Sequence, residues 1–514
     1  MSGLDDCHLF LPELWATHAR HNPEKEAVVC GDVRRSWREF DAAQNRVANA
    51  LLAAGIGRGH AVAVLMPSSV DILEVMFGIV RAGACVVPLS ALLTPDQLAT
   101  LIDDSGAVAV FCGAGLVDRL DAVRGRLGKV RADGWIAHDG AAPGWTSFTD
   151  FLGSAPDTFP DVAYRLDDPF NIIYSSGTTG LPKGIVQTHR ARQHWSFSNA
   201  VEMRFHEDAR ALTTTALYSN GTWLMVLPVL FAGGTLVVMP EFGTRRFLEL
   251  VAAERITHSF MVPTQLVMML EEPALDSMRP DGLEVLLSAG SALRPQTKEG
   301  VLARVTPRLY ELYGFSEGFA AMAKPALHRT KPDSVGRPVV GFEVMIVDDE
   351  GRALPTGEVG EIAGYGAGLM QGYHGRPDLT EAAIVRDARG RSFFRSGDIG
   401  RVDEDGCLTI LDRKKDMIIS GGFNVFPADI EALVADHPDV LDVTVIGVPH
   451  EKWGESAFAF VVPRGAADAD AIRDWANARL AKHQRLVGLA FREDFPRNAL
   501  GKVLKRLLRD EVPS

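Results

Sequence analysis

Apolar and polar positions along the first hundred residues follow two periods in turn, which predicts alternating helices and strands. Ser36-Trp37-Arg38-Glu39 is a capping box for a helix that runs to Gly55, and Thr94-Pro95-Asp96-Gln97 is a second capping box. A helix is expected from about Ser69 to Arg81, and short apolar strands at 61–66, 84–88 and 107–112. Strand and helix alternation of this kind predicts an α/β fold with parallel sheet covered by helices.

The pattern changes twice further along the chain. A second alternating block runs from Ala211 to about Ala323, and residues 223–240 within it predict a buried helix followed by a strand. Beyond Pro332, short strands separated by turns predict a small antiparallel sheet or barrel. The last hundred residues predict a compact mixed unit, with helices at 427–437 and 469–482 and strands at 440–448 and 458–462. A chain of 514 residues should divide into two or more domains.

Composition narrows the classes of function. The chain is 46% hydrophobic and 23% charged, as is typical of a globular protein. Its net charge of −13 argues against nucleic acid or an anionic membrane as the main partner. Its five cysteines form no CxxC pair, which favours a reducing compartment. Asp5 and Asp6 stand where a signal peptide carries positive charge, so we expect a cytoplasmic protein without a membrane span.

The stretch from Tyr174 to Gly184, with the sequence YSSGTTGLPKG, follows an apolar run that predicts a short buried strand. Its three glycines allow successive backbone amides to point at one anion, and four Ser/Thr hydroxyls and Lys183 surround them. The spacing is not that of a Walker loop, because Pro182-Lys183-Gly184 stands where Gly-Lys-Ser/Thr would be required. A surface turn would have the same composition, but the order of residues behind a strand favours a phosphate loop.

This stretch resembles the phosphate loop of the adenylate-forming superfamily, which includes acyl-CoA synthetases, aryl-CoA ligases, beetle luciferases and peptide-synthetase adenylation domains. Further segments resemble the motifs of that family in the family's order, and together they cover nearly the whole chain. They are residues 288–293 beside adenine, 310–321 for adenine and magnesium, 395–398 for ribose, 412–416 at a hinge, 420–425 for pantetheine, and 496–502 with a catalytic lysine.

Gly314-x-Ser316-x-Gly318 admits two interpretations. The spacing matches the nucleophile elbow of serine hydrolases, which requires a strand before Ser316 and a helix after it, with a histidine such as His374 or His450 completing a triad. In the adenylate-forming family, the corresponding segment packs an aromatic ring on adenine and binds Mg²⁺ through a glutamate, here Glu317. That family more often has threonine at the position of Ser316, and the hydroxyl is retained.

The resemblance implies a role for each matched position. The residues implied in catalysis are Thr178, Lys183, Glu317 and Lys502, with Glu317 also as the metal ligand. Those implied in binding ATP and CoA are Ser175, Ser176, Gly177, Thr179, Gly180, Gly290, Ser291, Ala292, Tyr313, Gly314, Ser316, Asp398, Arg413 and Gly422. Lys415 is the implied hinge, which divides the chain into a large adenylation domain, residues 1–412, and a small mobile domain, residues 413–514.

The same resemblance places the acid pocket. Its implied lining is Tyr218, Ser219, Asn220, Gly221, Trp223, Ala289, Ala320 and Ala321. Many acyl-CoA synthetases carry a histidine in the segment that corresponds to residues 218–222, and this histidine is missing here. That segment has no aspartate for the ammonium group of an amino acid and no arginine for a second carboxylate. The small residues leave room for an acid larger than acetate, which favours an aromatic or medium-chain monocarboxylic acid.

We therefore expect an AMP-forming acid–CoA ligase that uses ATP, Mg²⁺ and CoA. The alternatives are a serine hydrolase that uses Ser316 and a non-catalytic nucleotide-binding protein on the same fold. No nucleic acid is expected among its partners. A homodimer and a lysine acetyltransferase acting on Lys502 are further candidate partners.

Overall fold

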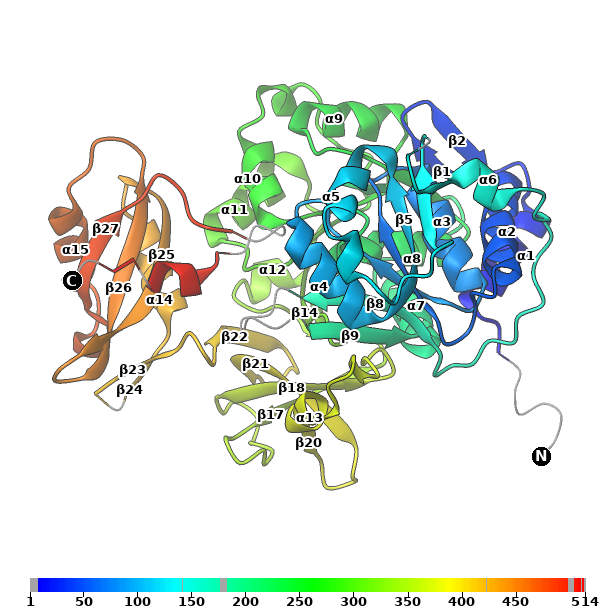
Figure 1. The fold of residues 1–514 in the computed structure, drawn as a ribbon. Coiled ribbons are helices and arrows are strands. Elements are labelled where there is room, and N and C mark those ends of the chain that lie inside the picture. Colours follow the sequence, from blue (N-terminus) through cyan, green and yellow to red (C-terminus); the bar gives the residue numbers. More distant parts are fainter. Residues whose placement is uncertain are drawn as a thin grey trace.

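The computed structural model describes residues 8–140, 142–175, 183–421, 423–497, 503–509 and 511–512. Figure 1 shows a large body of sheets and helices, a smaller sheet below it, and a separate unit that carries the C-terminus. The expected architecture is confirmed: helix-covered sheets that are mainly parallel, a small antiparallel subdomain, and a small C-terminal unit of mixed α and β structure.

The first sheet carries the strands on either side of the predicted phosphate loop. Its strand order is β19-β9-β8-β4-β3-β5-β6-β7, parallel from β8 to β7 and antiparallel between β8, β9 and β19. The antiparallel pair β8–β9 holds both ends of the loop side by side. The strands are β3 (Ala61–Leu65), β4 (Cys85–Pro88), β5 (Ala107–Gly113), β6 (Trp135–His138), β7 (Thr146–Ser147), β8 (Pro169–Ser175), β9 (Lys183–Thr188) and β19 (Gly372–Tyr373).

The second sheet has the order β16-β15-β14-β13-β12-β10-β11-β1-β2 and is parallel from β14 to β1. Its two edges are antiparallel, so the chain turns back on itself between β14 and β15. The strands are β1 (Glu26–Cys30), β2 (Val33–Ser36), β10 (Arg210–Thr213), β11 (Thr235–Val238), β12 (His258–Met261), β13 (Val285–Ala289), β14 (Leu309–Phe315), β15 (Phe319–Ala323) and β16 (Arg337–Pro338).

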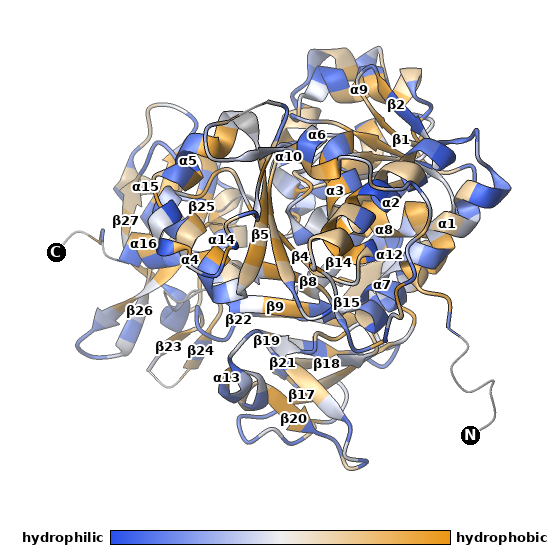
Figure 2. Ribbon diagram, turned by 45° about the vertical axis from the view of Figure 1, so that its right-hand side comes forward, coloured by the Kyte–Doolittle hydropathy of each residue, from blue (hydrophilic) through white to orange (hydrophobic). Residues whose placement is uncertain are grey.

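Helices pack between these two sheets and join them through one hydrophobic core, which contains Val64 of β3, Phe77 of α3, Val226 of α8 and Leu287 of β13. Figure 2 shows the apolar residues gathered on these inner strands and helices. The helices of the large body are α1 (Leu11–His21), α2 (Trp37–Ala53), α3 (Val70–Arg81), α4 (Pro95–Ser105), α5 (Val117–Asp121), α6 (Phe148–Leu152), α7 (His189–Glu202), α8 (Trp223–Phe231), α9 (Thr244–Ala253), α10 (Pro263–Leu270), α11 (Pro295–Gly300) and α12 (Leu327–Thr330).

Two further sheets follow along the chain. The smaller antiparallel sheet contains β17 (Phe342–Val347), β18 (Gly360–Gly366), β20 (Ile384–Arg386), β21 (Ser392–Val402) and β22 (Leu408–Arg413), with α13 (Pro377–Ala382) beside it. The C-terminal unit contains β23 (Ile418–Ser420), β24 (Phe423–Val425), β25 (Val440–His450), β26 (Gly454–Pro463) and β27 (Leu486–Phe491), with α14 (Pro427–Ala435), α15 (Ala469–Asn477) and α16 (Lys505–Arg509).

Local sequence signals set several of these boundaries. Both predicted capping boxes are confirmed: the backbone N–H of Ser36 donates to the Glu39 carboxylate at 2.8 Å, and that of Thr94 to Gln97 Oε1 at 2.9 Å. The predicted helix 469–482 is too long, because α15 ends at Asn477. The Asn477 amide bonds both backbone groups of Leu486 and draws the chain into β27. No helix in the described ranges is long and apolar enough to span a bilayer.

His189, the first residue of α7, is buried among the rings of Phe10, Tyr164 and Phe170. Neither ring nitrogen has a hydrogen-bond partner within the described ranges. Burial lowers its pKa to about 4. The folded protein therefore keeps this imidazole neutral at a pH where the unfolded chain protonates it.

We predict that this histidine makes the protein less stable in mild acid. Between about pH 6.5 and pH 4 the unfolded state binds one more proton at His189, so the free energy of unfolding falls by about 1.4 kcal/mol per pH unit. His189→Phe should reduce the slope by that amount in denaturant titrations across this range. His21→Phe, which removes an imidazole at an exposed position, is the matched control variant. Equal slopes in His189→Phe and the parent would contradict the assignment.

Candidate active site

The predicted site residues lie where β8, β9 and β19 of the first sheet approach β14 and β15 of the second. Lys183 is the first residue of β9, and Ser175 is the last residue of β8. The predicted loop residues Ser176, Gly177, Thr178, Thr179 and Gly180 lie outside the described residues, as do Gly422 and Lys502. The structure describes the residues that flank these segments.

Ser316, Glu317 and Gly318 form the turn between β14 and β15. Gly318 has φ of +123°, and a Cβ there would lie 2.2 Å from the carbonyl oxygen of Gly368, so only glycine fits. The backbone N–H of Met370 donates to the carbonyl of Glu317 at 2.7 Å, which ties the turn to the segment before β19. Gln187 of β9 donates its side-chain N–H to the carbonyl of Ser316 at 3.0 Å. The turn is thereby attached to the first sheet from two sides.

This turn does not have the geometry of a serine-hydrolase elbow. The helix expected after Ser316 is wrong: residues 319–323 form β15, paired with β14 in the register Phe315↔Phe319. Glycine at 318 permits the tight reversal, and sheet pairing then outcompetes a helix. No histidine in the described part of the chain hydrogen-bonds the Ser316 hydroxyl. A hydrolase using Ser316 is therefore not supported.

Glu317 is held by Tyr373, a residue that the sequence analysis did not single out. The Tyr373 hydroxyl donates to Glu317 Oε1 at 2.6 Å, and Lys183 Nζ lies 5.2 Å from the centre of the same ring. Burial, with the Glu317 charge next in importance, raises the pKa of Tyr373 well above its usual value, so the phenol remains a donor. Pairing of Gly372 and Tyr373 with β9 fixes this arrangement. The structure thus brings Lys183 and Glu317 together through one aromatic ring.

Asp398, Tyr313 and Arg413 form a second cluster. Asp398 and Arg413 face each other across β21 and β22, with 3.4 Å between the guanidinium and the carboxylate. The Tyr313 hydroxyl donates to the other carboxylate oxygen at 2.7 Å. Burial raises the pKa of Tyr313 well above its usual value, and the charge of Asp398 adds to this. Three residues predicted from separate motifs are therefore in direct contact.

The residues predicted to line the acid pocket divide into two groups. Ala289, Ala320, Ala321 and Trp223 are buried in the same hydrophobic core. Ala320 lies opposite Gly314, and Ala321 lies opposite Tyr313 in the β14–β15 hairpin. Tyr218, Ser219, Asn220 and Gly221 form the second group and are partly buried. Gly290, Ser291 and Ala292, which were predicted to bind the nucleotide or CoA, are exposed after β13.

Arg192 of α7 contacts Asn220 in the segment predicted to line the acid pocket, and no sequence motif had marked this arginine. Its Nη2 donates to Asn220 Oδ1 at 2.9 Å and its Nε donates to Asn171 Oδ1 at 2.7 Å, while the guanidinium lies 4.7 Å from the Trp223 ring. It is only 4% exposed, and burial lowers its pKa to about 9.

No carboxylate in the described ranges pairs with Arg192. Arg81, equally buried, pairs with Asp41 at 2.6 Å. A buried cation without a counter-charge is costly, and the amide oxygens of Asn171 and Asn220 accept hydrogen bonds from this guanidinium.

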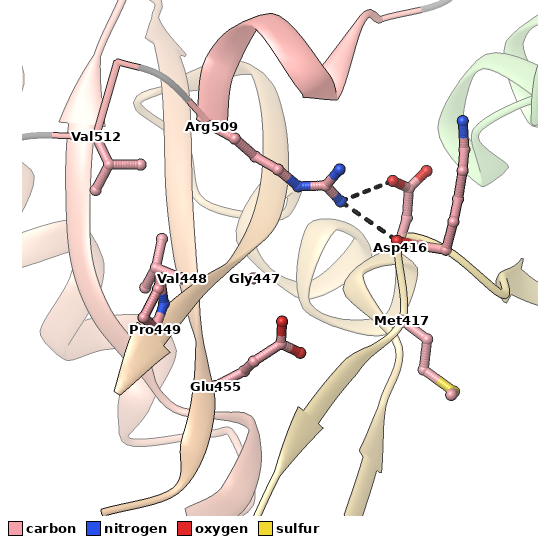
Figure 3. A pocket seen from close by; sticks show the side chains of 9 residues that line it. Asp416, Met417, Gly447, Val448, Pro449, Glu455, Arg509 and Val512 are labelled. Atoms are coloured by element: carbon pink, nitrogen blue, oxygen red, sulfur yellow. Dashed lines mark hydrogen bonds and ion pairs between the residues drawn. The ribbon is translucent and has the colours of Figure 1, made fainter. Parts of the chain in front are cut away.

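Lys415, the predicted hinge, lines a cavity of about 460 Å³ together with Asp416, Met417 and residues of the C-terminal unit. Figure 3 shows Arg509 reaching across this cavity to the hinge segment. Its guanidinium donates to Asp416 Oδ1 at 2.9 Å and approaches the carbonyl of Lys415 at 3.5 Å. The helix α16 is therefore attached directly to the residue that follows the hinge.

Comparison with known proteins agrees with this geometry. A family model described as AMP-binding enzyme matches residues 15–374, and one described as AMP-binding enzyme C-terminal domain matches residues 429–502. The chain belongs to the AMP-binding enzyme family. The serine hydrolase was the wrong alternative, and the resemblance to adenylate-forming enzymes is confirmed.

Several relatives match almost the whole chain. A long-chain-fatty-acid–CoA ligase of Mycobacterium tuberculosis is 33% identical over 500 residues, which is 95% of this chain and 96% of the relative. An indoleacetate–CoA ligase of Aromatoleum aromaticum is 34% identical over 505 residues, which is 96% of each chain.

Among solved structures, ATP-bound MatB from Rhodopseudomonas palustris is 30% identical and superposes with a TM-score of 0.87, covering 97% of this chain and 98% of that chain. The apo form of the same protein gives 0.76 at the same coverage. The present structure is therefore closer in overall arrangement to the ATP-bound form.

Proposed function

We propose that this family member is an AMP-forming ligase that joins an aromatic or medium-chain monocarboxylic acid to the thiol of CoA. The observation that carries the proposal is a pair of side-chain clusters, Lys183–Tyr373–Glu317 and Tyr313–Asp398–Arg413. Tyr313 lies on β14 and Glu317 lies in the turn after it, while Lys183 begins the strand that follows residues 176–182. The first cluster suits phosphates and the second suits a ribose diol. Relatives that share nearly the full length are named as acid–CoA ligases, which supports the same assignment.

In the first step, a carboxylate oxygen of the acid attacks the α-phosphorus of ATP, and the bond to pyrophosphate breaks. Negative charge grows on the bridging and leaving oxygens, so the charges of Lys183 and Lys502 and the amides of residues 176–180 would stabilise the transition state. Asp398 would accept the ribose hydroxyls, with Arg413 beside it. Tyr313 would pack on adenine, while Gly290–Ala292 would line the path between adenine and the acid.

Mg²⁺ belongs to this proposal, with Glu317 as its ligand. The described ranges contain no group of three or more potential protein ligands for a metal. Magnesium in nucleotide sites is commonly bound by one or two carboxylates plus phosphates and water, so a single carboxylate suffices. Glu317 Oε2 accepts no hydrogen bond from a described residue, whereas Oε1 is held by Tyr373. The ion would neutralise phosphate charge.

In the second step, the CoA thiol attacks the acyl carbon and AMP leaves. This step does not need Lys502 but needs a path for pantetheine, which we assign to the segment around Gly422. Movement of a small domain, residues 413–514, about Lys415 would exchange one arrangement for the other. Acetylation of Lys502 would remove its charge, so a lysine acetyltransferase remains a candidate partner, as does a homodimer. Unpaired cysteines at four described positions support a cytoplasmic site of action.

The test is pyrophosphate release from ATP over a panel of carboxylic acids, with and without CoA. Ala289, Ala320 and Ala321 are small side chains at the predicted acid pocket, and Arg192 places a cation beside Asn220. The panel should therefore include ring acids with and without oxygen substituents. We expect acid-dependent pyrophosphate release, with thioester and AMP accumulating only when CoA is present. Pyrophosphate release that no acid stimulates, from folded protein, would refute the proposal.

A second prediction concerns the metal. Tyr373→Phe removes the donor that orients Glu317, and loss of such a supporting hydrogen bond typically weakens metal affinity about 10-fold or more. The Mg²⁺ concentration for half-maximal pyrophosphate release should therefore rise about 10-fold. The control is Tyr365→Phe, because the Tyr365 hydroxyl makes no hydrogen bond in the described ranges. An unchanged or lower Mg²⁺ requirement in Tyr373→Phe would show that Tyr373 does not support the metal ligand.

A further inference from the structure

Asp442 lies where the C-terminal unit meets the large body. It is on β25, and one carboxylate oxygen pairs with Arg294, which immediately precedes α11 of the large body. The other oxygen pairs with Arg497 of the C-terminal unit. One carboxylate therefore joins two guanidinium groups from different parts of the molecule.

Arg497 stands at the base of the predicted lysine loop. It forms an antiparallel bridge with Val503, so these two residues hold the two ends of segment 498–502 together. In Figure 1, the chain leading to this segment passes beside α11. A second contact in the same strip joins Gln296 of α11 to Asp436 of the C-terminal unit at 2.8 Å.

Asp442 determines whether the charges at this contact attract or repel each other. With the carboxylate present, both arginines are attracted to one point between the domains. Without it, two guanidinium groups face each other and the attraction becomes repulsion. The three side chains remain 20% to 42% exposed. Ion pairs at such exposure are weak and sensitive to salt, which suits a contact that must break in every turnover.

We propose that Asp442 is a positioning residue that latches the small domain onto the large one for adenylation, by pairing with Arg294 and with Arg497 at the base of the lysine loop. The inference deepens the proposed function and rests on it. The latch favours the first half-reaction, in which Lys502 is needed. It must open before the second half-reaction, in which the acyl group passes to CoA.

The experiment separates the two half-reactions in Asp442→Asn and Arg294→Ala. Adenylation is followed by acid-dependent pyrophosphate release, and thioester formation is followed from a supplied acyl adenylate and CoA. We expect adenylation to fall about 3- to 10-fold, the range of a partly exposed ion pair or two, with thioester formation unchanged or faster. Asp439→Asn is the control, because the Asp439 side chain is exposed and makes no ion pair with the large body in the described ranges. Both half-reactions of this variant should match those of the parent.

Two further readouts distinguish a latch from a merely structural role. In the Arg294→Ala background, Asp442→Asn should have a smaller effect than in the parent, because the interdomain pair is already lost. Small-angle scattering without substrates should show a larger radius of gyration for Asp442→Asn than for Asp439→Asn.

Equal loss of both half-reactions, or no loss of adenylation with unchanged scattering, would overturn the latch. If the parent enzyme shows no acid-dependent pyrophosphate release, the proposed function fails, and scattering still tests the domain contact.

Discussion

The candidate site depends most on the interactions of the Asp398 carboxylate with Tyr313 and Arg413. It is almost fully buried, accepts a hydrogen bond from Tyr313 of the second sheet, and faces Arg413 at the end of β22. The residues after Arg413 lead directly to the predicted hinge, Lys415, and to the C-terminal unit. A buried charge is costly unless it is paired or hydrogen-bonded. The contacts of Asp398 therefore hold the second sheet, the small antiparallel sheet and the start of the predicted hinge in fixed positions relative to one another.

A chain with a net charge of −13 must collect positive charge locally if it is to bind ATP and an acid. The structure does this with few groups: Lys183 beside Tyr373, Arg413 beside Asp398, and Arg192 behind Asn220. Each of these cations is held by an aromatic ring, an amide or a carboxylate from a different segment. The site is therefore assembled by the two large sheets and the small sheet together, and no single motif contains it.

Because the site is assembled from distant segments, only part of it could be predicted from the sequence. Helix starts at Ser36 and Thr94 followed from residues three positions apart, because the capping interactions are local. The motifs of Tyr313, Asp398 and Arg413 were predicted from family resemblance, and the structure brings them into contact. Tyr373 was missed because its hydrogen bond spans 56 residues. The helix expected after Ser316 was wrong because pairing with β14, a tertiary contact, decided the conformation of residues 319–323.

In the proposed reaction, the acid attacks the α-phosphorus of ATP. The most direct measurement supplies a carboxylic acid labelled with ¹⁸O in its carboxylate, together with ATP and CoA, and follows the label by mass spectrometry. Attack at the α-phosphorus leaves one carboxylate oxygen on the phosphate of AMP after the thioester has formed, so labelled AMP and unlabelled pyrophosphate are predicted. Label in inorganic phosphate or pyrophosphate, or unlabelled AMP alongside newly formed thioester, would contradict the account.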